Sequence, residues 1–216
     1  MGQALRSGRF ITFEGGEGSG KTTHIRLLAA ALKHAGVEAV TTREPGGAPG
    51  AEEIRNLLLS GAPERWDVES EALLMVAARR NHLVATVWPA LDEGRIVLCD
   101  RFADSTEAYQ GWGRGLARER IVELHRLVAE DFAPDLTLVL DLPVEQGLAR
   151  AARRRDGETR FERMSLEFHE RIRLGFLDIV RREPERCRLI DARAEIDTVH
   201  RAVLAEVGRL LGLKLS

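Results

Sequence analysis

The chain has 216 residues, enough for one domain with a sizeable hydrophobic core. Apolar residues make up 44% of it and charged residues 31%, a balance that excludes a wholly disordered protein. The formal net charge of −2 argues against bulk nucleic acid as the main partner. The longest apolar runs are too short to span a bilayer, and the first nine residues lack the apolar core of a signal peptide. We therefore expect a soluble, cytoplasmic protein with no membrane partner.

Short apolar runs alternate with longer amphipathic stretches along the chain. The predicted strands are, in order, 9–13, 38–42, 96–99, 136–142 and 188–190. The predicted helices are 21–34, 51–60, 68–91, 117–132, 144–155, 161–182 and 196–211. Gly36 is expected to end the first helix, and Pro89 to break the third. Nearly continuous apolar strands between helices predict an α/β fold with a five-stranded parallel sheet, covered on both faces, in one domain over 1–216.

The two cysteines belong to neither a CxxC motif nor a Cys/His cluster, so a metal site or a redox pair built on them is not expected. Cys99 lies in an apolar run and is predicted to be buried in a strand, whereas Cys187 has no pattern around it. Two thiols in a chain of this size fit a reducing compartment.

A glycine-rich segment follows the first predicted strand, precedes the first predicted helix and matches G-x-x-x-x-G-K-[ST]. Its residues, with the one that follows, are Gly15, Gly16, Glu17, Gly18, Ser19, Gly20, Lys21, Thr22 and Thr23. Glycines let backbone N–H groups turn inward around phosphate oxygens, and the positive end of the helix dipole faces the same anion. Lys21 adds a charge at the β- and γ-phosphates, and the Thr22 hydroxyl is placed to ligate Mg²⁺. The segment predicts a nucleoside triphosphate site of the P-loop NTPase type, with Mg²⁺ bound beside the phosphates.

This loop alone does not distinguish a kinase from an ATPase, a GTPase or a motor. An N-K-x-D guanine signature is absent, and the length leaves little room for a regulatory or DNA-binding domain. The sequence favours an enzyme that transfers the terminal phosphoryl group to a small acceptor. A nucleotide-binding switch or assembly ATPase without an acceptor is the alternative from another class.

Two further strands each end in an arginine next to a carboxylate, at Arg43-Glu44 and at Asp100-Arg101. Ligands bind open α/β sheets at this edge, and guanidinium groups bind phosphate oxygens bidentately. Two helical arginines, Arg55 and Arg79, could converge on the same place. The alternative for any single arginine is a surface ion pair. Arg101 fits that alternative least, because it lies at the end of a predicted strand. Asp100 is the candidate carboxylate for Mg²⁺ or the acceptor oxygen, and Asp141 is a weaker one.

Arginines gather between 150 and 163, with the break Asp156-Gly157-Glu158 in the middle. A solvated helix end explains such a run, and so does a nucleic-acid patch, although aromatic residues are sparse here. The functional interpretation is a small helical lid at about 148–163 that closes over ATP. Arg150 and Arg154 are then the candidates to supply positive charge to the transferring phosphoryl group.

Several segments, taken in this order, resemble the bacterial thymidylate kinases, which phosphorylate dTMP with ATP. They are 13–23, Thr-Arg-Glu-Pro-Gly-Gly at 42–47, Ala-Ala-Arg at 77–79, Asp-Arg-Phe at 100–102, 105–111 and 134–137. The resemblance implies a single nucleoside monophosphate kinase-like domain that makes dTDP and ADP, in the pathway to dTTP, and that forms a homodimer.

The resemblance also implies which side chains bind dTMP. They are Glu44, Pro45, Arg55, Met75, Arg79, Arg101, Thr106, Tyr109 and Gln110. The three arginines would hold the phosphate, and Glu44 and Pro45 would shape the acceptor side of the cleft. Thr106 and Gln110 would lie near the thymine ring and Tyr109 near the deoxyribose. Lys21, Asp100, Arg101, Arg150 and Arg154 would form the catalytic set.

One feature of the chain fits the family pattern, and another departs from it. Members carry the catalytic arginine either in the phosphate loop or in the lid, and this loop has none, which fits the lid-supplied arrangement. Met75 stands where the family often has a phenylalanine that stacks on thymine, and a thioether packs more softly on a ring. A related kinase that acts on another nucleoside or nucleotide therefore remains an alternative.

Overall fold

The computed structural model describes residues 7–153 and 160–215. Its centre is a sheet in which all neighbouring strands are parallel. The strands are β1 (Arg9–Glu14), β2 (Ala39–Arg43), β3 (Ile96–Asp100), β4 (Leu136–Asp141) and β5 (Cys187–Asp191), in the spatial order β2-β3-β1-β4-β5. The predicted α/β class with a five-stranded parallel sheet is confirmed.

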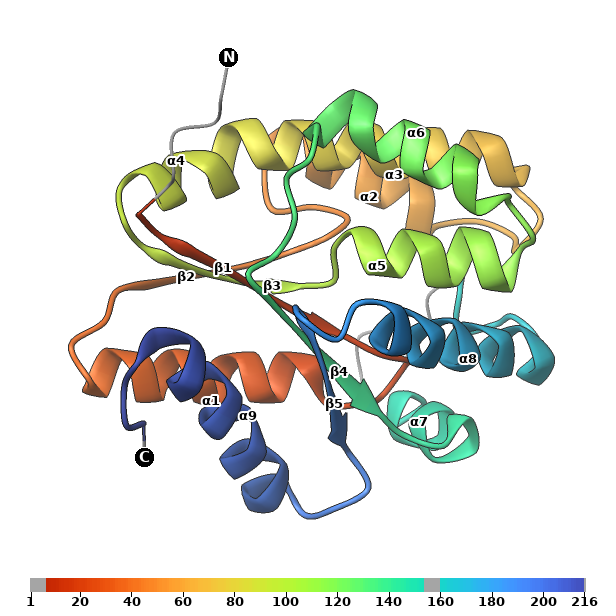
Figure 1. Cartoon of the computed structure of the whole chain (residues 1–216). Helices are drawn as coiled ribbons and strands as arrows, with labels where there is room; N and C mark the ends of the chain where they lie inside the picture. The colour runs from red at the N-terminus through yellow and green to blue at the C-terminus, as the bar shows by residue number, and fades with distance from the viewer. Residues whose placement is uncertain (1–6, 154–159, 216) are drawn as a thin grey trace.

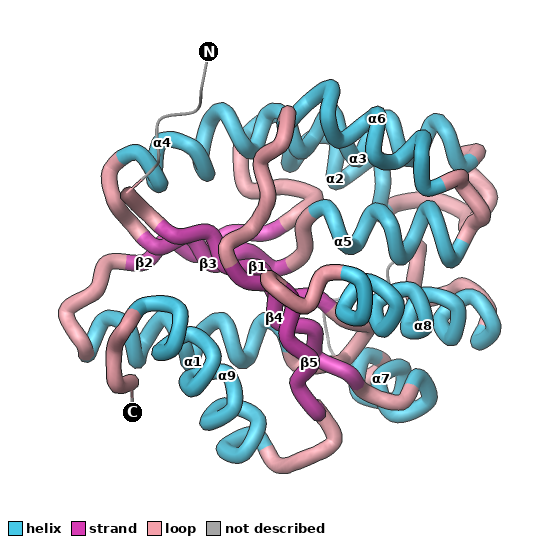
Figure 2. The backbone as a smooth tube through the Cα atoms, viewed as in Figure 1, coloured by secondary structure: helices cyan, strands magenta, loops and turns pink. Residues whose placement is uncertain are grey.

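Helices cover both faces of this sheet (Figures 1 and 2). They are α1 (Lys21–His34), α2 (Pro49–Leu59), α3 (Val68–His82), η1 (Leu83–Val87), α4 (Trp88–Asp92), α5 (Ala103–Thr106), η2 (Glu107–Gly113), α6 (Arg118–Ala129), α7 (Val144–Ala151), α8 (Leu166–Arg182) and α9 (Ile196–Leu211). Helices α1 and α9 lie on one face, and α3, α5, α6 and α8 lie on the other (Figure 1).

The position of β1 in the middle of the sheet explains its continuous apolar run. Successive side chains of a strand point to opposite faces. Ile11 and Phe13 accordingly pack with α1 and α9, whereas Phe10 packs with η1, α4 and β3 on the other face. All three side chains are fully buried. This rigid central strand leads directly into the phosphate loop.

Helix ends follow capping chemistry. Gly36 has φ +76° and lies just beyond α1, where Val37 N donates to Leu32 O at 2.9 Å, so the predicted helix end is confirmed. The helix predicted at 161–182 begins only at Leu166, because Ser165 is its N-cap and accepts from Phe168 N at 3.3 Å. The helix predicted at 144–155 ends at Ala151, and positions 154 and 155 lie outside the described residues.

The long helix predicted at 68–91 is observed as α3, η1 and α4 in direct succession. Pro89 does not end it in a loop. A proline in a helix clashes with the carbonyl four residues earlier. Here the π-helical turn η1 precedes Pro89 and changes the hydrogen-bond register, so the chain continues as a helix.

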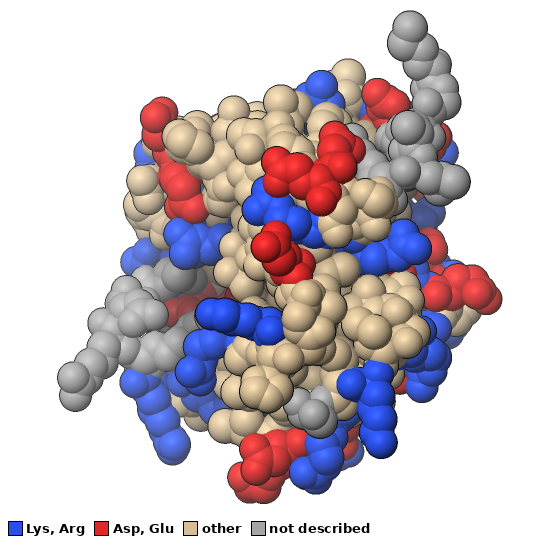
Figure 3. Space-filling model, turned by 90° about the vertical axis from the view of Figure 1, so that its left-hand side faces the viewer, with Lys and Arg blue, Asp and Glu red and all other residues tan. Residues whose placement is uncertain are grey.

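Within the described residues, no helix is both long and apolar enough to cross a membrane. On the face that lies at the left of Figure 1, acidic and basic side chains are interspersed (Figure 3). That distribution matches the near-zero net charge of the chain.

Candidate active site

The carboxyl ends of β1, β2 and β3 open onto a cleft of about 1600 Å³. The phosphate loop lines one side, and residues that follow β2 and β3, together with α2, α3 and η2, line the other. All the side chains predicted to bind dTMP line this cleft, as do Asp100, Arg150 and the loop from Glu17 to Thr23. The sheet thus brings together segments that lie far apart in the sequence.

The phosphate loop depends on glycine for its shape. Gly15, Gly18 and Gly20 have φ of +129°, +64° and +94°. A Cβ on Gly18 would lie 2.0 Å from the carbonyl oxygen of Gly147 in α7, so the loop and the start of the predicted lid meet backbone to backbone. Gly147 carries no motif and was not found by sequence reasoning.

Lys21 spans the inside of this loop. Its Nζ donates to Gly15 O at 3.1 Å, to Gly16 O at 2.9 Å and to Ser19 Oγ at 3.3 Å. Burial and the nearby Arg101 guanidinium lower the pKa of Lys21 to about 8. The ammonium group is therefore held where a bound polyphosphate would stabilise its charge.

Thr22 and Asp100 offer oxygen ligands at the edge of the loop. Thr22 Oγ1 donates to Asp100 Oδ2 at 2.8 Å. Mg²⁺ prefers oxygen ligands, and with nucleotides it usually takes only one or two from the protein. The pair fits that ion, although the described residues hold no cluster of three or more His, Cys, Asp or Glu side chains. Asp141, the weaker candidate, instead pairs with Arg173 at 2.7 and 3.0 Å.

Arg101 lies at the end of β3 and reaches back to the phosphate loop. Its Nη1 donates to Gly15 O at 3.0 Å, and its Nη2 donates to Glu17 Oε1 at 3.0 Å. The guanidinium also lies 4.9 Å above the centre of the Tyr109 ring, and the Tyr109 hydroxyl donates to Glu17 Oε1 at 2.7 Å. Burial alone would raise the pKa of Glu17, but Arg101 and Lys21 outweigh it and lower the pKa to about 2. Glu17 therefore holds the side chains of Arg101 and Tyr109 against the phosphate loop.

Glu44 is the centre of a second buried network. It accepts from Arg79 Nε at 2.8 Å and from His82 Nδ1 at 3.0 Å. Arg79 Nη2 then donates to Thr106 Oγ1 at 2.9 Å, and His82 Nε2 lies 2.7 Å from Thr42 Oγ1. Glu44 and Arg79 are only 5% and 3% exposed, so burial would raise the pKa of Glu44 if Arg79 and His82 did not lower it. This network excludes the surface ion pair that was the alternative for Arg79.

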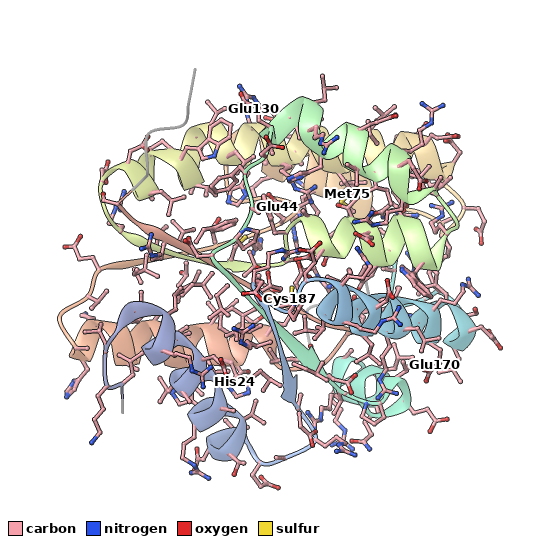
Figure 4. All side chains as sticks on the ribbon, viewed as in Figure 1. His24, Glu44, Met75, Glu130, Glu170 and Cys187 are labelled. Atoms are coloured by element: carbon pink, nitrogen blue, oxygen red, sulfur yellow. The ribbon has the colours of Figure 1, made fainter. Side chains whose placement is uncertain are left out.

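Hydrogen bonds also fix Arg55 and Gln110, two more residues that line the cleft. Arg55 Nη1 donates to the carbonyl oxygen of Pro45 at 2.7 Å, which fixes the predicted acceptor loop against α2. Gln110 is fully buried, and its Nε2 donates to Glu71 Oε1 at 2.8 Å. Figure 4 shows Glu44 and Met75 on the face of the sheet that α3 covers, with His24 on the opposite face.

A family model for thymidylate kinase matches residues 13–203 of the chain. The chain belongs to the thymidylate kinase family. The thymidylate kinase of Caulobacter vibrioides is 54% identical over 209 residues, which cover 97% of this chain and 100% of that protein. The thymidylate kinase of Ruegeria pomeroyi is 53% identical over 193 residues, covering 89% and 91%. The crystal structure of thymidylate kinase from Ehrlichia chaffeensis matches with a TM-score of 0.77 at 39% identity and covers 93% of this chain and 98% of that one.

Thymidylate kinases use ATP, and the lid predicted to close over it contains several arginines. The structure places these arginines differently. Arg150 lines the cleft, and its Nη1 lies 3.4 Å from Ala192 O. Arg154 lies outside the described residues. Arg160 is fully buried: it donates to Leu58 O at 2.9 Å and to Pro63 O at 2.7 Å, and it pairs with Glu71. Arg160 is thus fixed in the protein interior, and the lid interpretation does not extend to it.

Proposed function

We propose that this protein transfers the γ-phosphoryl group of ATP to dTMP and releases dTDP and ADP, a step toward dTTP. One observation supports an acceptor site beside the nucleotide loop most directly. Lys21 Nζ and Arg101 Nη1 both bond to the Gly15 carbonyl oxygen, at 3.1 and 3.0 Å. Lys21 is suited to bind the donor phosphates and Arg101 to bind an acceptor phosphate, and the two cations share this one oxygen atom as a hydrogen-bond acceptor. A nucleotide switch without an acceptor has no need of the second cation.

The chemistry requires position and charge rather than a covalent intermediate. A phosphate oxygen of dTMP attacks the γ-phosphorus in line, and the bond to the β,γ-bridging oxygen breaks. The phosphate loop and Lys21 hold the donor phosphates. Thr22 and Asp100 would hold Mg²⁺, which neutralises charge on the β- and γ-phosphates when it is bound. Arg55, Arg79 and Arg101 would orient the acceptor phosphate, and Arg150 and Arg154 of the lid would add charge at the moving phosphoryl group.

The remaining side chains of the acceptor half would select the nucleoside. Thr106 and Gln110 carry the hydroxyl and the amide that a thymine edge can pair with. Tyr109 is fixed between Arg101 and Glu17, so its rigid ring would crowd a 2′-hydroxyl group. Met75 would pack on the base, with Glu44 and Pro45 shaping the adjacent wall.

An acceptor panel tests this proposal. ATP consumption would be measured with dTMP, dUMP, UMP, CMP and thymidine, beside the Lys21→Ala variant as a control that lacks the loop cation. We expect consumption to depend on an acceptor, to be fastest with dTMP and to be lost in Lys21→Ala. ATP hydrolysis that needs no acceptor would favour a switch or assembly ATPase, and a preference for another acceptor would favour a related kinase.

We propose further that the whole chain is one kinase domain that works in the cytoplasm as a homodimer. Cys99 and Cys187 are unpaired thiols, which fit a reducing compartment. Leu73 and Val84 are 53% and 49% exposed and lie three helical turns apart along α3 and η1. Leu127 on the neighbouring α6 is 78% exposed. Exposed apolar side chains on these neighbouring elements support a contact between two copies.

A further inference from the structure

The turn that carries Arg101 is held in an unfavourable backbone conformation. Among the described non-glycine residues, only Arg101 and Glu130 have a positive φ, and that of Arg101 is +71°. This left-handed conformation is strained for a residue with a side chain, because its Cβ approaches the following carbonyl oxygen. Arg101 N donates to Phe13 O at 2.9 Å, which fixes the start of the turn against β1. Other contacts must stabilise the part of the turn that follows.

Glu14, the last residue of β1, supplies those contacts. Its side chain is fully buried and faces the turn. Oε1 accepts from Phe102 N at 2.7 Å and from Ser105 N at 3.3 Å. Oε2 accepts from the Ser105 hydroxyl at 2.6 Å. One carboxylate therefore satisfies the two backbone N–H groups and the hydroxyl that follow Arg101.

The Ser105 hydroxyl passes this constraint to the Arg101 side chain. A serine hydroxyl has one proton, and Glu14 takes it. Its oxygen is then left to accept, and Arg101 Nη1 donates to it at 3.2 Å. Glu14 thus fixes both the backbone of Arg101 and, through Ser105, the direction of its guanidinium group.

The neighbouring carboxylate of Asp104 does not bond to the Arg101 turn. Asp104 accepts from both terminal nitrogens of Arg186 at 2.8 Å and from the Thr137 hydroxyl at 3.3 Å. Its bonds therefore run toward β4 and away from the Arg101 turn, so Glu14 is the carboxylate bonded to the backbone of that turn.

We propose that Glu14 is a positioning residue for phosphoryl transfer, which holds the Arg101 guanidinium at the place where the acceptor phosphate binds. The inference rests on the proposed function, in which Arg101 contacts that phosphate. Glu14 itself touches neither substrate, because its carboxylate is buried behind the turn.

A double-mutant cycle between Glu14→Gln and Arg101→Ala tests the inference. Glutamine keeps the size and one acceptor oxygen, but its NH₂ group faces the Ser105 hydroxyl with the wrong polarity. We expect Glu14→Gln to lower kcat/KM for dTMP by about tenfold or more and to leave the Kd for ADP within about threefold. In the Arg101→Ala background, the same change should cost less than about threefold, because the group it positions is gone.

The outcomes separate the inference from the function on which it rests. If Arg101→Ala leaves the dTMP parameters unchanged, the proposed acceptor site is wrong. A different outcome overturns the inference while Arg101→Ala still impairs dTMP use. It is that Glu14→Gln lowers kcat/KM for dTMP by the same factor with or without Arg101, or that it weakens ADP binding as much as dTMP use. Glu14 would then only stabilise the fold.

A milder pair of variants keeps the test decisive if Glu14→Gln does not fold. Ser105→Ala removes the relay hydroxyl and leaves the backbone bonds to Glu14 in place. It should raise KM for dTMP without changing the Kd for ADP, and Ser105→Thr, which keeps the hydroxyl, should behave like the wild type. Equal behaviour of the alanine and threonine variants would overturn the relay.

Discussion

Gly15 brings two cations to a single carbonyl oxygen, and this arrangement has an energetic consequence. Lys21 and Arg101 repel each other across that oxygen, and Arg101 contributes to the lowered pKa of Lys21. Glu17 offsets part of the repulsion through its bond to Arg101. In the proposed function, phosphate groups bound between the two cations would relieve the remaining repulsion.

Glu14 also makes stability depend on pH. Burial and the charge of Asp104 raise its pKa to about 7 from 4.5. A raised carboxyl pKa gives a contribution that is fully present below the unfolded pKa and is lost as the pH rises through the folded pKa. Glu14→Gln removes this contribution. The free energy of unfolding of Glu14→Gln, relative to the wild type, should therefore rise between pH 5 and 7 and level off above about 7.5.

Urea unfolding at several pH values measures that difference. Glu145→Gln at an exposed position of α7 is the control, and its difference from the wild type should stay nearly constant. A Glu14→Gln difference that is also independent of pH would contradict a raised pKa.

At the scale of residues, sequence reasoning found side chains that lie beside a motif or a strand end. Lys21, Thr22, Asp100 and Arg101 follow directly from the phosphate loop and from where ligands bind parallel sheets. Glu14 did not, because its partners lie 88 and 91 residues further along the chain. Nothing in the local sequence distinguishes such a carboxylate from any other buried end of a strand.

At the scale of elements, the end of the predicted lid, from Arg160 onward, is anchored rather than helical. Arg160 N donates to Leu59 O at 3.2 Å, and its side chain reaches two further carbonyls and Glu71. Glu71 in turn receives Gln110 and Arg114, both at 2.8 Å. The segment is thus tied to α2, α3 and η2, the elements that form the acceptor half of the cleft.

Arg160→Met should destabilise the protein by about 3 kcal/mol, because it leaves two carbonyls without a donor and removes one of the two guanidinium groups that pair with buried Glu71. Arg163 provides a matched control. It donates to Gly61 O at 2.6 Å from a less buried position, so Arg163→Met should change stability by no more than about 1 kcal/mol. Urea unfolding at neutral pH measures both. Equal losses in the two variants would contradict a structural role specific to Arg160.

Two adjacent elements, α5 and η2, were missed by sequence reasoning for physical reasons. Sequence patterns identify helices through a period of 3.6 residues. The π-helical segment η2 has i→i+5 bonding, so its apolar side chains do not recur at that period. The region 107–113 was therefore not predicted as helical, although it carries Tyr109 and Gln110. Helix α5, which carries Thr106, has four residues and is too short for a recurring pattern. The regular helices α1 and α9, in contrast, have the predicted bounds.

At the scale of the whole molecule, the strand order separates two tasks. One face of the sheet packs on α1 and α9, which follow the phosphate loop and close the chain. The other face packs on η1, α4 and α6. Elements α3 and η1 line the cleft through Met75, Arg79 and Thr86. Leu73, Val84 and Leu127 are exposed on α3, η1 and the neighbouring α6. A dimer formed through these three exposed side chains would therefore pack against the layer that positions Arg79 and would leave the cleft uncovered.

Leu127→Glu tests this arrangement. A carboxylate buried in an apolar contact costs several kcal/mol, and each 1.4 kcal/mol changes a dissociation constant about tenfold. We expect the wild type to sediment at twice the mass of the chain at micromolar concentration, and Leu127→Glu to sediment at the mass of one chain. Leu174→Glu is the matched control, because Leu174 is 53% exposed on α8 and away from α3. The control should remain dimeric. A dimer that survives Leu127→Glu but not Leu174→Glu would place the interface on α8, and a monomeric wild type would contradict the proposed homodimer altogether.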